Sequence, residues 1–413
     1  MFDISKKTLA VIALMFAAFT VILITVYITT AVVGGTGSVD GADISARQET
    51  LEERYGRLDE VYEIIMEEYY QEPDSEALLL GAIDGMLNAL DDPYTFYYTV
   101  EEMTESKEES EGIYFGVGML VSSDQNGNLT VLRVFKDSPA QKSGVLPGDI
   151  IIAANGEKVS AETVEKMNEA VDKIKGSENT EVMLTILRRN EEIDIPVMRG
   201  DITVNRVEYE ILEGNIGYVM LYEFFGDAAD GVREAFDAFK LADVDGVIFD
   251  VRSNAGGQLD ICLEISDMIL PEGKITYIED RQGRQQNYYS DSDKYNFPMV
   301  FLINEMSASA SELLTAAVQE YDVATVVGTR SYGKGIVQTL REFNSDHAGI
   351  QLTTASYFTP NGVSIHKTGV TPDIEVEMWD QYDSSVFHPD LDNDNQLKVA
   401  YDTLMEMIQN QDQ

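Results

Sequence analysis

The sequence predicts a multidomain protein that combines an α/β region with α+β regions. Three observations predict this class. Apolar residues recur at helical spacing from residue 47 to about 90, short apolar runs punctuated by glycine fill residues 112–200, and strand-like runs alternate with helix-like runs over residues 201–380. The alternation favours helices packed on a largely parallel sheet, because parallel strands need crossover connections. Residues 381–413 are expected to form an acidic segment and a closing helix.

The N-terminus has the clearest compositional signal. Lys6 and Lys7 precede an apolar run, and no charged residue occurs between Thr8 and Val39. Since about 20 apolar residues suffice to cross a bilayer as a helix, we expect a transmembrane signal anchor over residues 8–33. The two lysines predict that the start of the chain stays cytoplasmic and that the bulk of the protein is extracytoplasmic.

This topology leaves a short cytoplasmic tail, residues 1–7, and a Gly- and Asp-rich linker, residues 34–46, that leads to the exported part. The alternative is a cleaved signal peptide, after which the protein would be secreted. The apolar core of a signal peptide is usually about 7–15 residues long, which is shorter than this run. A single-pass protein of the cell membrane is therefore the expectation.

Residues 47–111 are expected to form a small helical module. A first helix is indicated by apolar residues at spacings of three, four and seven, namely Leu51, Leu58, Val61, Ile64 and Ile65. A second helix follows, for which Ser75 is the expected N-cap and Leu78 and Leu79 the first core residues. The acidic stretch 101–112 is expected to be a charged connector.

The whole chain is strongly acidic, with a formal net charge of −44 over 413 residues. This charge argues against nucleic-acid binding, because phosphates need a basic surface, and against peripheral binding to anionic lipid. A charged, solvated surface is the simpler interpretation. The one cysteine, Cys262, lies in an apolar run and is expected to be a small buried hydrophobe.

A Gly-rich loop opens the second region. It consists of Phe115, Gly116, Val117 and Gly118, and "DSPAQKSGVLPGDIIIAANG" follows further on. This order resembles a PDZ domain of the permuted kind found in bacterial proteases, over residues 112–200, and the resemblance implies that the loop binds a peptide carboxylate. Glycines let successive backbone N–H groups converge on one carboxylate, and a strand edge accepts an extended peptide. A plain β-turn is the alternative interpretation.

Two small-residue turns of the third region fall where sites form in parallel sheets. "SNAGGQ" follows the strand-like run "VIFDVR", and "SASAS" follows "VFLINEM". Ligands in α/β proteins bind at the carboxyl ends of the strands. We therefore expect a site where these two turns meet.

The second of these turns contains three serines at alternate positions, Ser307, Ser309 and Ser311. Glu312 follows Ser309 by three residues, which is the capping-box pattern, so Ser309 as a purely structural N-cap is one interpretation. A nucleophile is the other, since free N–H groups at a helix start stabilise an oxyanion. A nucleophilic serine also needs a base.

The best candidate for this base is Lys334 in "SYGKGIVQ". The flanking Gly333 and Gly335 allow close approach to another backbone, and burial lowers the pKa of a lysine so that its neutral amine can take a proton. Gln338 faces the same side of a strand four residues on, and can hydrogen-bond the amine. A solvated lysine in a Gly-rich hairpin is the alternative.

In combination these motifs resemble those of the carboxyl-terminal processing peptidases, the tail-specific serine proteases of the S41 type. "GAIDGMLNALDDPYT", "VIFDVRSNAGG", "YFTPNGVSIHKTGVTPDIEV" and "DNDNQLKVAYDTL" each resemble a family segment, so the likeness covers nearly the whole exported part. The resemblance implies a ClpP/crotonase-like protease core over residues 201–380.

The same resemblance implies roles for individual residues. Ser309 would be the nucleophile, Lys334 the general base and Gln338 the residue that orients it. The implied oxyanion hole uses two backbone N–H groups, those of Ala310 and Gly256, with Ala255 or Gly257 as alternatives to Gly256.

The chain departs from the family pattern in two places. Val363 and the pair Lys175-Gly176 stand where the family often has arginine. These departures leave open how the PDZ domain is coupled to catalysis, and they do not touch the catalytic assignment.

The sequence thus predicts a membrane-anchored, extracytoplasmic serine endopeptidase that recognises protein C-termini through a PDZ domain and cleaves through a Ser–Lys dyad. A proteolytically inactive PDZ-type peptide-binding or scaffold protein is one alternative. Another is a Ser–His hydrolase that uses His366, one of three histidines with His347 and His388.

The expected partners are proteins or peptides with an exposed C-terminus, and the membrane through the anchor. A homodimer is open, because relatives of this kind often dimerise through terminal elements. No metal or cofactor is expected, since the sequence has no Walker-type loop and no clustered His/Cys set.

Overall fold

The structure is a computed structural model. It describes residues 41–111, 114–123, 127–189, 191–202, 204–379 and 389–411. These fall into two compact units, one made of the described parts of 104–337 and 354–411, and the other of 41–103 and 338–353.

The expected cytoplasmic tail and anchor, residues 1–33, lie outside the described residues. Among the residues that are described, no helix is both long enough and apolar enough to cross a membrane. The end of the expected linker is described and is helical, because helix α2 spans Gly41–Glu68.

The smaller unit contains α2, α3 (Ser75–Asn88) and β1 (Phe96–Tyr98). It also holds the start of β18 (Gly349–Phe358), whose residues 349–351 pair antiparallel with β1. The prediction of Ser75 as N-cap of α3 is wrong. Asp74 is the N-cap, and its carboxylate accepts from the N–H groups of Glu76 and Ala77 at 3.0 and 3.1 Å. Leu79, expected in the core, is 59% exposed.

The acidic stretch expected to be a connector is instead helix α4 (Val100–Glu111). A reciprocal capping box begins it. Thr99 donates its N–H to the carboxylate of Glu102 at 2.8 Å, and Glu102 donates its N–H to the hydroxyl of Thr99 at 3.2 Å. This is the Thr-x-x-Glu pattern that precedes helices. The sequence therefore carried a start signal that the charge of the segment obscured.

The second region folds as an antiparallel β domain with two short helices. Its elements are β2 (Tyr114–Gly116), β3 (Met119–Ser123), β4 (Leu129–Val134), α5 (Pro139–Ser143), β5 (Ile150–Ala154), β6 (Glu157–Lys158), α6 (Val164–Ile174), β7 (Glu181–Arg188), β8 (Glu191–Met198) and β9 (Gly200–Ile202). The main sheet has the order β3-β4-β5-β7-β8, β6 pairs with β5, and β2 pairs with β9. One apolar cluster, centred on residues such as Leu129, Ile151 and Leu184, fills the interior.

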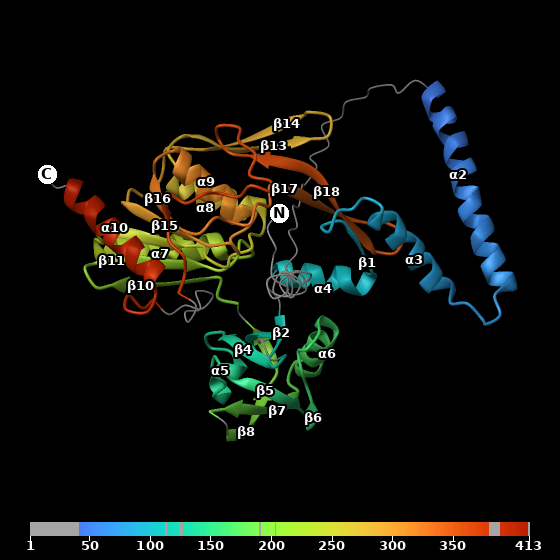
Figure 1. The fold of residues 1–413 in the computed structure, drawn as a ribbon, viewed down its shortest axis with the longest axis horizontal. Coiled ribbons are helices and arrows are strands. Elements are labelled where there is room, and N and C mark those ends of the chain that lie inside the picture. Colours follow the sequence, from blue (N-terminus) through green and yellow to red (C-terminus); the bar gives the residue numbers. More distant parts are fainter. Residues whose placement is uncertain are drawn as a thin grey trace. The chain divides into compact units, whose positions relative to one another are not determined.

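The third region is the predicted α/β layer. It comprises β10 (Val207–Leu212), β11 (Ile216–Leu221), α7 (Ala228–Ala242), β12 (Gly246–Asp250), α8 (Leu259–Ile269), β15 (Met299–Ile303), α9 (Ala310–Glu320), β16 (Ala324–Gly328), β19 (Ile374–Glu375) and α10 (Asn395–Gln411). The sheet order is β10-β11-β12-β15-β16-β19 (Figure 1). Pairs from β11 onward are parallel, and only β10 runs antiparallel. The prediction of a largely parallel sheet is confirmed.

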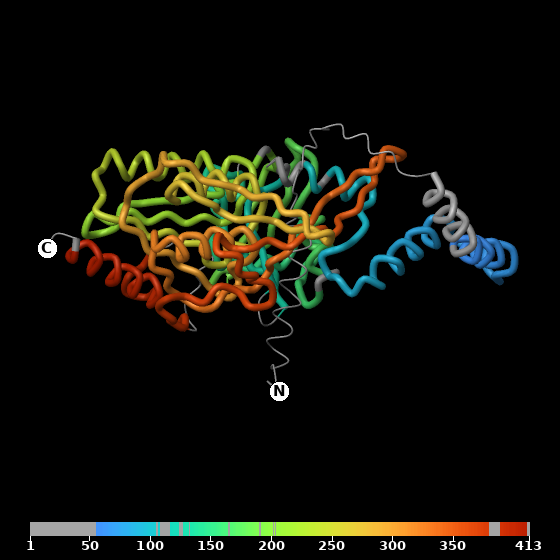
Figure 2. The backbone as a smooth tube through the Cα atoms, turned by 90° about the horizontal axis from the view of Figure 1, so that it is seen from above, coloured from blue at the N-terminus to red at the C-terminus, as the bar shows by residue number. Residues whose placement is uncertain are grey.

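Both faces of this sheet are covered by helices. Val219 and Leu221 belong to the apolar cluster shared with α7, α8 and α9, whereas Tyr218 and Met220 belong to the cluster shared with α10. Figure 2 shows α10 in red and α7 in yellow-green on opposite sides of the sheet. Strands buried on both faces read as continuous apolar runs, as β11 and β15 do.

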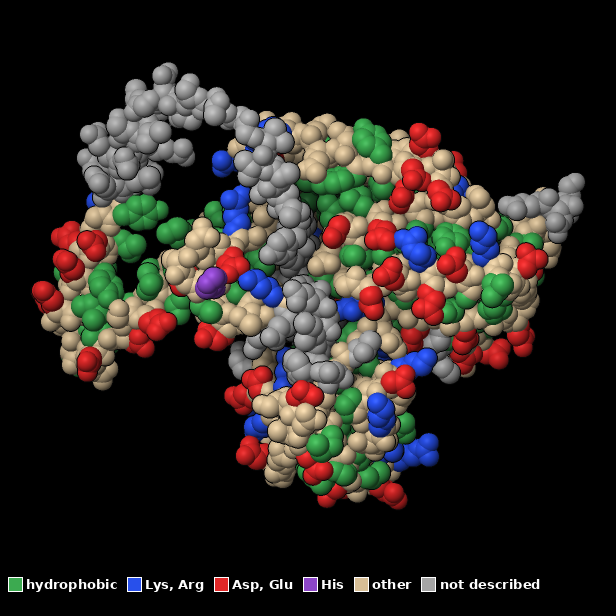
Figure 3. All heavy atoms as spheres, turned by 180° about the vertical axis from the view of Figure 1, so that it is seen from behind, with side chains coloured by type: hydrophobic (Ala, Val, Ile, Leu, Met, Phe, Trp, Pro, Cys, Tyr) green, Lys and Arg blue, Asp and Glu red, His purple; other side chains and the backbone are tan. Residues whose placement is uncertain are grey.

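A second sheet borders this layer. The hairpin of β13 (Gly273–Asp280) and β14 (Gln285–Ser290) is antiparallel, and residues 355–358 of β18 pair with β13. β17 (Ile336–Glu342) pairs with β18. On the face drawn in Figure 3, Asp and Glu side chains are spread over the described surface, with Lys and Arg side chains among them.

A buried ion network attaches α10 to the end of β12. The guanidinium of Arg252 donates to Asp250 and to Asp394, each at 2.6–3.0 Å, and to the side-chain oxygen of Gln396 at 3.2 Å. Tyr218 donates its hydroxyl to Asp250 at 2.7 Å. Burial alone would lower the pKa of Arg252, but the facing carboxylates raise it well above its usual value. The last helix is thus joined to the turn that follows β12.

Candidate active site

Ser309 lies at the turn between β15 and α9. Its backbone has φ 57° and ψ −113°, and its side chain is buried at 4% exposure. An ordinary N-cap residue is extended, so this conformation is strained for a residue with a Cβ. Strain of this kind persists where the surrounding structure enforces it, often at functional sites.

The Gly-rich turn after β12 lies directly against Ser309. A Cβ placed on Gly256 would be 2.8 Å from the Cβ of Ser309 and 2.9 Å from the nitrogen of Ala310. Gly256 also has φ 103°, which disfavours any other residue. Only glycine fits here, and the two small-residue turns meet as the sequence predicted.

The backbone N–H groups at this junction differ in their partners. Gly256 donates its N–H to the side-chain oxygen of Asn254 at 2.8 Å. Neither Ala310 nor Gly257 donates its N–H to another residue in the described part of the chain. Ala310 is the first residue of α9, where N–H groups have no partner within the helix. Two donors at this turn can therefore receive an external acceptor.

Lys334 is buried at 5% exposure between two glycines that pack on backbone. A Cβ on Gly333 would lie 3.1 Å from the nitrogen of Gly369, and one on Gly335 would lie 2.6 Å from the nitrogen of His366. The hydroxyl of Tyr357 donates to the carbonyl of Lys334. The expectation that the glycines permit close backbone approach is confirmed.

Glu312 joins the serine turn to the lysine loop. One carboxylate oxygen accepts from the N–H groups of Ser309 and Lys334 at 2.9 and 2.8 Å. The other accepts from the hydroxyl of Ser331 and the N–H of Gly333, both at 2.6 Å. The sequence identified Glu312 only as the partner of a helix cap and gave no sign of its bonds to residues 331–334.

Burial of Glu312, which is fully inaccessible, raises its pKa. The four donors act against this effect because they favour the ionised form. Three of the four partners are backbone N–H groups, which can only donate, and the Ser331 hydroxyl can donate as well. This donor set fits the carboxylate form, which only accepts hydrogen bonds.

Gln338 belongs to the smaller unit and is fully buried. Its side-chain nitrogen donates to the hydroxyl of Thr353 at 3.1 Å. Its side-chain oxygen accepts no hydrogen bond from any described residue. A buried acceptor without a partner is energetically unfavourable.

In the β domain, the predicted peptide-binding loop, residues 115–118, consists of the end of β2 and the two residues that precede β3. Gly118 has φ 78°, and a Cβ there would lie 2.3 Å from the Cβ of Ser138. The carbonyls of Val117 and Gly118 accept from the N–H groups of Ala140 and Phe135 at 2.7 and 3.0 Å. The loop is thereby fixed on the start of α5, beside β3, which is an edge of the main sheet.

Cys262 is fully buried, as predicted, and is no nucleophile. Its thiol donates to the carbonyl of Ala310 at 3.4 Å. Burial raises its pKa to about 12. The reactive thiolate is therefore scarce at neutral pH.

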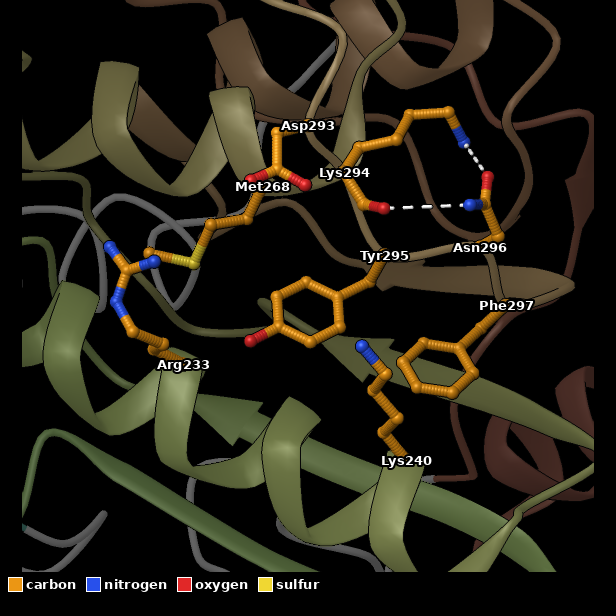
Figure 4. Close-up of a pocket in the computed structure, with 8 residues that line it drawn as sticks. All are labelled: Arg233, Lys240, Met268, Asp293, Lys294, Tyr295, Asn296 and Phe297. Atoms are coloured by element: carbon orange, nitrogen blue, oxygen red, sulfur yellow. Dashed lines mark hydrogen bonds between the residues drawn. The ribbon is translucent and has the colours of Figure 1, made fainter.

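A cavity of about 390 Å³ lies between α7, α8 and the segment before β15 (Figure 4). It is lined by Arg233, Lys240, Met268, Asp293, Lys294, Tyr295, Asn296 and Phe297. Its polar groups are largely paired within the protein: Arg233 with Glu264 at 2.6 Å, and Lys294 with Asn296 at 2.8 Å. None of the predicted site residues lines this cavity.

The chain combines a strained serine at a strand–turn–helix junction with a PDZ-like β domain, and this combination is typical of multidomain serine peptidases. The sequence matches three family descriptions: peptidase family S41 over residues 215–376, a PDZ domain over 130–188, and the N-terminal domain of the activating protease CtpB over 20–102.

Individual relatives agree. Carboxy-terminal processing protease CtpA of Bacillus subtilis is 32% identical over 368 residues, which covers 88% of this chain and 77% of that protein. The carboxy-terminal-processing protease of Bartonella bacilliformis is 36% identical over 333 residues, 78% and 74% of the two chains. The solved photosystem II D1 C-terminal processing protease superposes with a TM-score of 0.52 at 27% identity, covering 82% of this chain and 89% of that one.

The chain belongs to peptidase family S41. It is a serine-type, carboxy-terminal processing peptidase with an N-terminal CtpB-like domain, a PDZ domain and a protease core. The family resemblance and the fold class predicted from the sequence are confirmed.

We predict that Glu312→Gln impairs both stability and activity. Whichever way the amide is placed, its NH₂ group replaces a carboxylate oxygen that accepts two hydrogen bonds in the wild-type protein. Each buried group left unpaired costs about 1–3 kcal/mol. In one placement the N–H groups of Ser309 and Lys334 lose their shared acceptor, and in the other Ser331 and Gly333 lose theirs. Urea unfolding and peptide hydrolysis measure the two effects.

Glu320→Gln is the matched control, because Glu320 ends the same helix and its carboxylate accepts one exposed bond from the N–H of Asn361 at 2.8 Å. That variant should remain close to wild type in both measurements. Wild-type activity of Glu312→Gln would contradict the bridging role of the carboxylate.

Proposed function

We propose that this peptidase cleaves through a Ser–Lys dyad, with Ser309 as nucleophile and Lys334 as general base. The observation that supports this most directly is the shared carboxylate: Glu312 accepts from the N–H groups of both residues, at 2.9 and 2.8 Å. Their backbones are therefore neighbours, and both side chains are buried. Burial disfavours a charged ammonium, as a lysine base requires.

In the proposed reaction, neutral Lys334 takes the hydroxyl proton of Ser309 while Oγ bonds to the scissile carbonyl carbon. The carbonyl π electrons move to oxygen. Collapse of this intermediate breaks the C–N bond, and the leaving amine takes the proton from the Lys334 ammonium. Water then attacks the ester and passes a proton to Lys334. The acid product leaves as Ser309 regains its proton.

The oxyanion would accept hydrogen bonds from Ala310 and from the Gly256 turn. In the latter, the N–H of Gly256 is bonded to Asn254, whereas that of Gly257 is available among described residues. Gly257 is therefore favoured over Gly256 as the second donor. We also propose Gln338 as the residue that orients the base, as its position four residues after Lys334 in the sequence predicts.

We further propose that the PDZ domain binds the C-terminal carboxylate of its protein substrates through the loop 115–118. The fixed loop and the adjacent edge strand β3 support this role, since an extended peptide can add to a sheet edge. The apolar run 8–33 supports a membrane anchor with the catalytic part outside.

Replacing either dyad residue should abolish proteolysis. Ser309→Ala and Lys334→Ala should each lower kcat by about 10⁴-fold or more, and the double variant should be hardly worse, because a nucleophile and its base act as a unit. Lys334→Arg should fail as well, since a guanidinium cannot lose its proton. Hydrolysis of a peptide with a free C-terminus, with circular dichroism to verify folding, measures this.

His366→Ala discriminates the Ser–His alternative, because it should stay active if Lys334 is the base. The backbone of His366 packs on Gly335, so alanine keeps that contact. An inactive wild-type protein would instead favour the scaffold alternative. A well-folded and active Lys334→Arg variant would overturn the dyad.

Amidation of the substrate C-terminus should weaken recognition. It removes a charge that accepts hydrogen bonds worth about 1.5–3 kcal/mol each, which corresponds to about a 10- to 100-fold rise in KM. Peptide pairs that differ only in this group provide the comparison. Equal kinetics for the two forms would argue against capture of a free carboxylate.

The anchor predicts that protease added to intact spheroplasts digests the chain beyond residue 40. The same digestion after detergent lysis is the control for accessibility. Full protection in intact spheroplasts would refute the extracytoplasmic location.

A further inference from the structure

Of the three serines at alternate positions, the proposed function uses only the middle one, Ser309. Ser307 and Ser311 are nevertheless fully buried, at 0% exposure each. A buried hydroxyl without a partner is unfavourable, and both have one. Each donates its hydroxyl to a backbone carbonyl of the other turn of the site.

Ser311 donates its hydroxyl to the carbonyl of Asn254 at 2.8 Å. The same carbonyl accepts from the N–H of Ala308 at 3.0 Å. The side chain of Asn254 is also engaged, since its oxygen accepts from the N–H of Gly256 and its nitrogen donates to the carbonyl of Leu221, at 2.8 and 2.7 Å. Asn254 thus links Ser311 to Gly256: its carbonyl accepts from the Ser311 hydroxyl, and its side-chain oxygen accepts from the N–H of Gly256.

Ser307 makes the equivalent contact on the other side of the nucleophile. Its hydroxyl donates to the carbonyl of Val251 at 2.7 Å and accepts from the N–H of Asn304 at 3.0 Å. In turn, the carbonyl of Ser307 accepts from the N–H of Tyr332 at 3.0 Å, two residues before Lys334. Both hydroxyls therefore reach the 251–254 segment from positions two residues before and after Ser309.

We propose that Ser307 and Ser311 are positioning residues that clamp the nucleophile turn onto the turn that supplies the second oxyanion donor. This proposal rests on Ser309 as the nucleophile. The two turns are in close contact at Gly256, because a Cβ there would lie only 2.9 Å from the Ala310 nitrogen. The clamp thereby sets the separation of the Ala310 donor from the donor of the Gly-rich turn.

The expected consequence is a change in transition-state stabilisation and not in peptide binding. An oxyanion donor must lie at about 2.7–3.1 Å from the developing charge, and a misplacement of about 1 Å costs about 100-fold in rate. Loss of one clamp bond relaxes the spacing, while the PDZ loop that we propose binds the substrate carboxylate is untouched. The defect should therefore appear in kcat, with KM unchanged.

The variants should still fold. Ser→Ala removes only a hydroxyl, and the two turns remain joined through the N–H of Ser253, which donates to the side-chain oxygen of Asn304 at 2.8 Å. Ser266→Ala is a matched control. Ser266 is equally buried, and its hydroxyl donates to the carbonyl of Cys262 at 2.7 Å, within α8 and away from either turn.

The test compares full-length Ser307→Ala, Ser311→Ala, Ser266→Ala and Ser309→Ala for kcat, KM and thermal unfolding. Inhibition by a peptide aldehyde, whose adduct with Ser309 places an oxygen in the oxyanion site, is measured alongside. We expect Ser307→Ala and Ser311→Ala to lose about 10- to 100-fold in kcat and a similar factor in aldehyde affinity, with KM unchanged. Ser266→Ala should match them in thermal unfolding and keep wild-type kcat.

Two results would overturn the clamp: kcat of Ser307→Ala and Ser311→Ala equal to that of Ser266→Ala, or a loss of kcat without any loss of aldehyde affinity. Failure of the underlying mechanism looks different, because Ser309→Ala would then remain active. The two failures are thus distinguishable in one set of measurements.

Discussion

The arrangement of the site depends on one buried carboxylate, that of Glu312. Removing a charge from water costs several kcal/mol, and hydrogen bonds to a charged group return about 1.5–3 kcal/mol each. Four such bonds are enough to retain the charge, and they come from two separate chain segments. Glu312, which the sequence marks only as part of a helix cap, therefore connects the serine turn to the lysine loop.

A second layer of buried polar contacts supports the opposite side of the site. The turn after β12 is bordered by Arg252, whose partners include Asp394 at the start of the last helix. The same turn receives the hydroxyls of Ser307 and Ser311. The two turns that carry the proposed oxyanion donors are thus held from both faces of the sheet. Such rigidity is what preorganised stabilisation of charge requires, since donors that need no rearrangement cost nothing at the moment of reaction.

The PDZ domain and the protease core of this S41 peptidase are structurally separate. The PDZ domain has its own apolar cluster and its own sheet, and the protease core has separate clusters on the two faces of a parallel sheet. Function resides in turns carried by these rigid layers. The strained backbone of Ser309 and the glycines at 256, 333 and 335 are all in such turns.

Much of this protein was determined by its sequence alone. Strand and helix periodicity predicted the parallel layer, and the Gly- and Ser-rich turns at strand ends marked the place where Ser309 and Gly256 meet. These are local signals, because periodicity and glycine conformations act over a few residues.

Local signals also existed where the prediction was wrong: Asp74 caps α3 in place of Ser75, and the Thr99–Glu102 box starts a helix in the acidic stretch. The tertiary structure alone decided three of the four partners of Glu312, which lie 19–22 residues further along the chain. It also decided the carbonyls to which Ser307 and Ser311 donate, 56 and 57 residues before them, and the ion pair of Arg252 with Asp394, 142 residues away. Sequence spacing cannot specify such contacts, because they depend on how whole layers pack and on which buried polar groups the packing leaves to be paired.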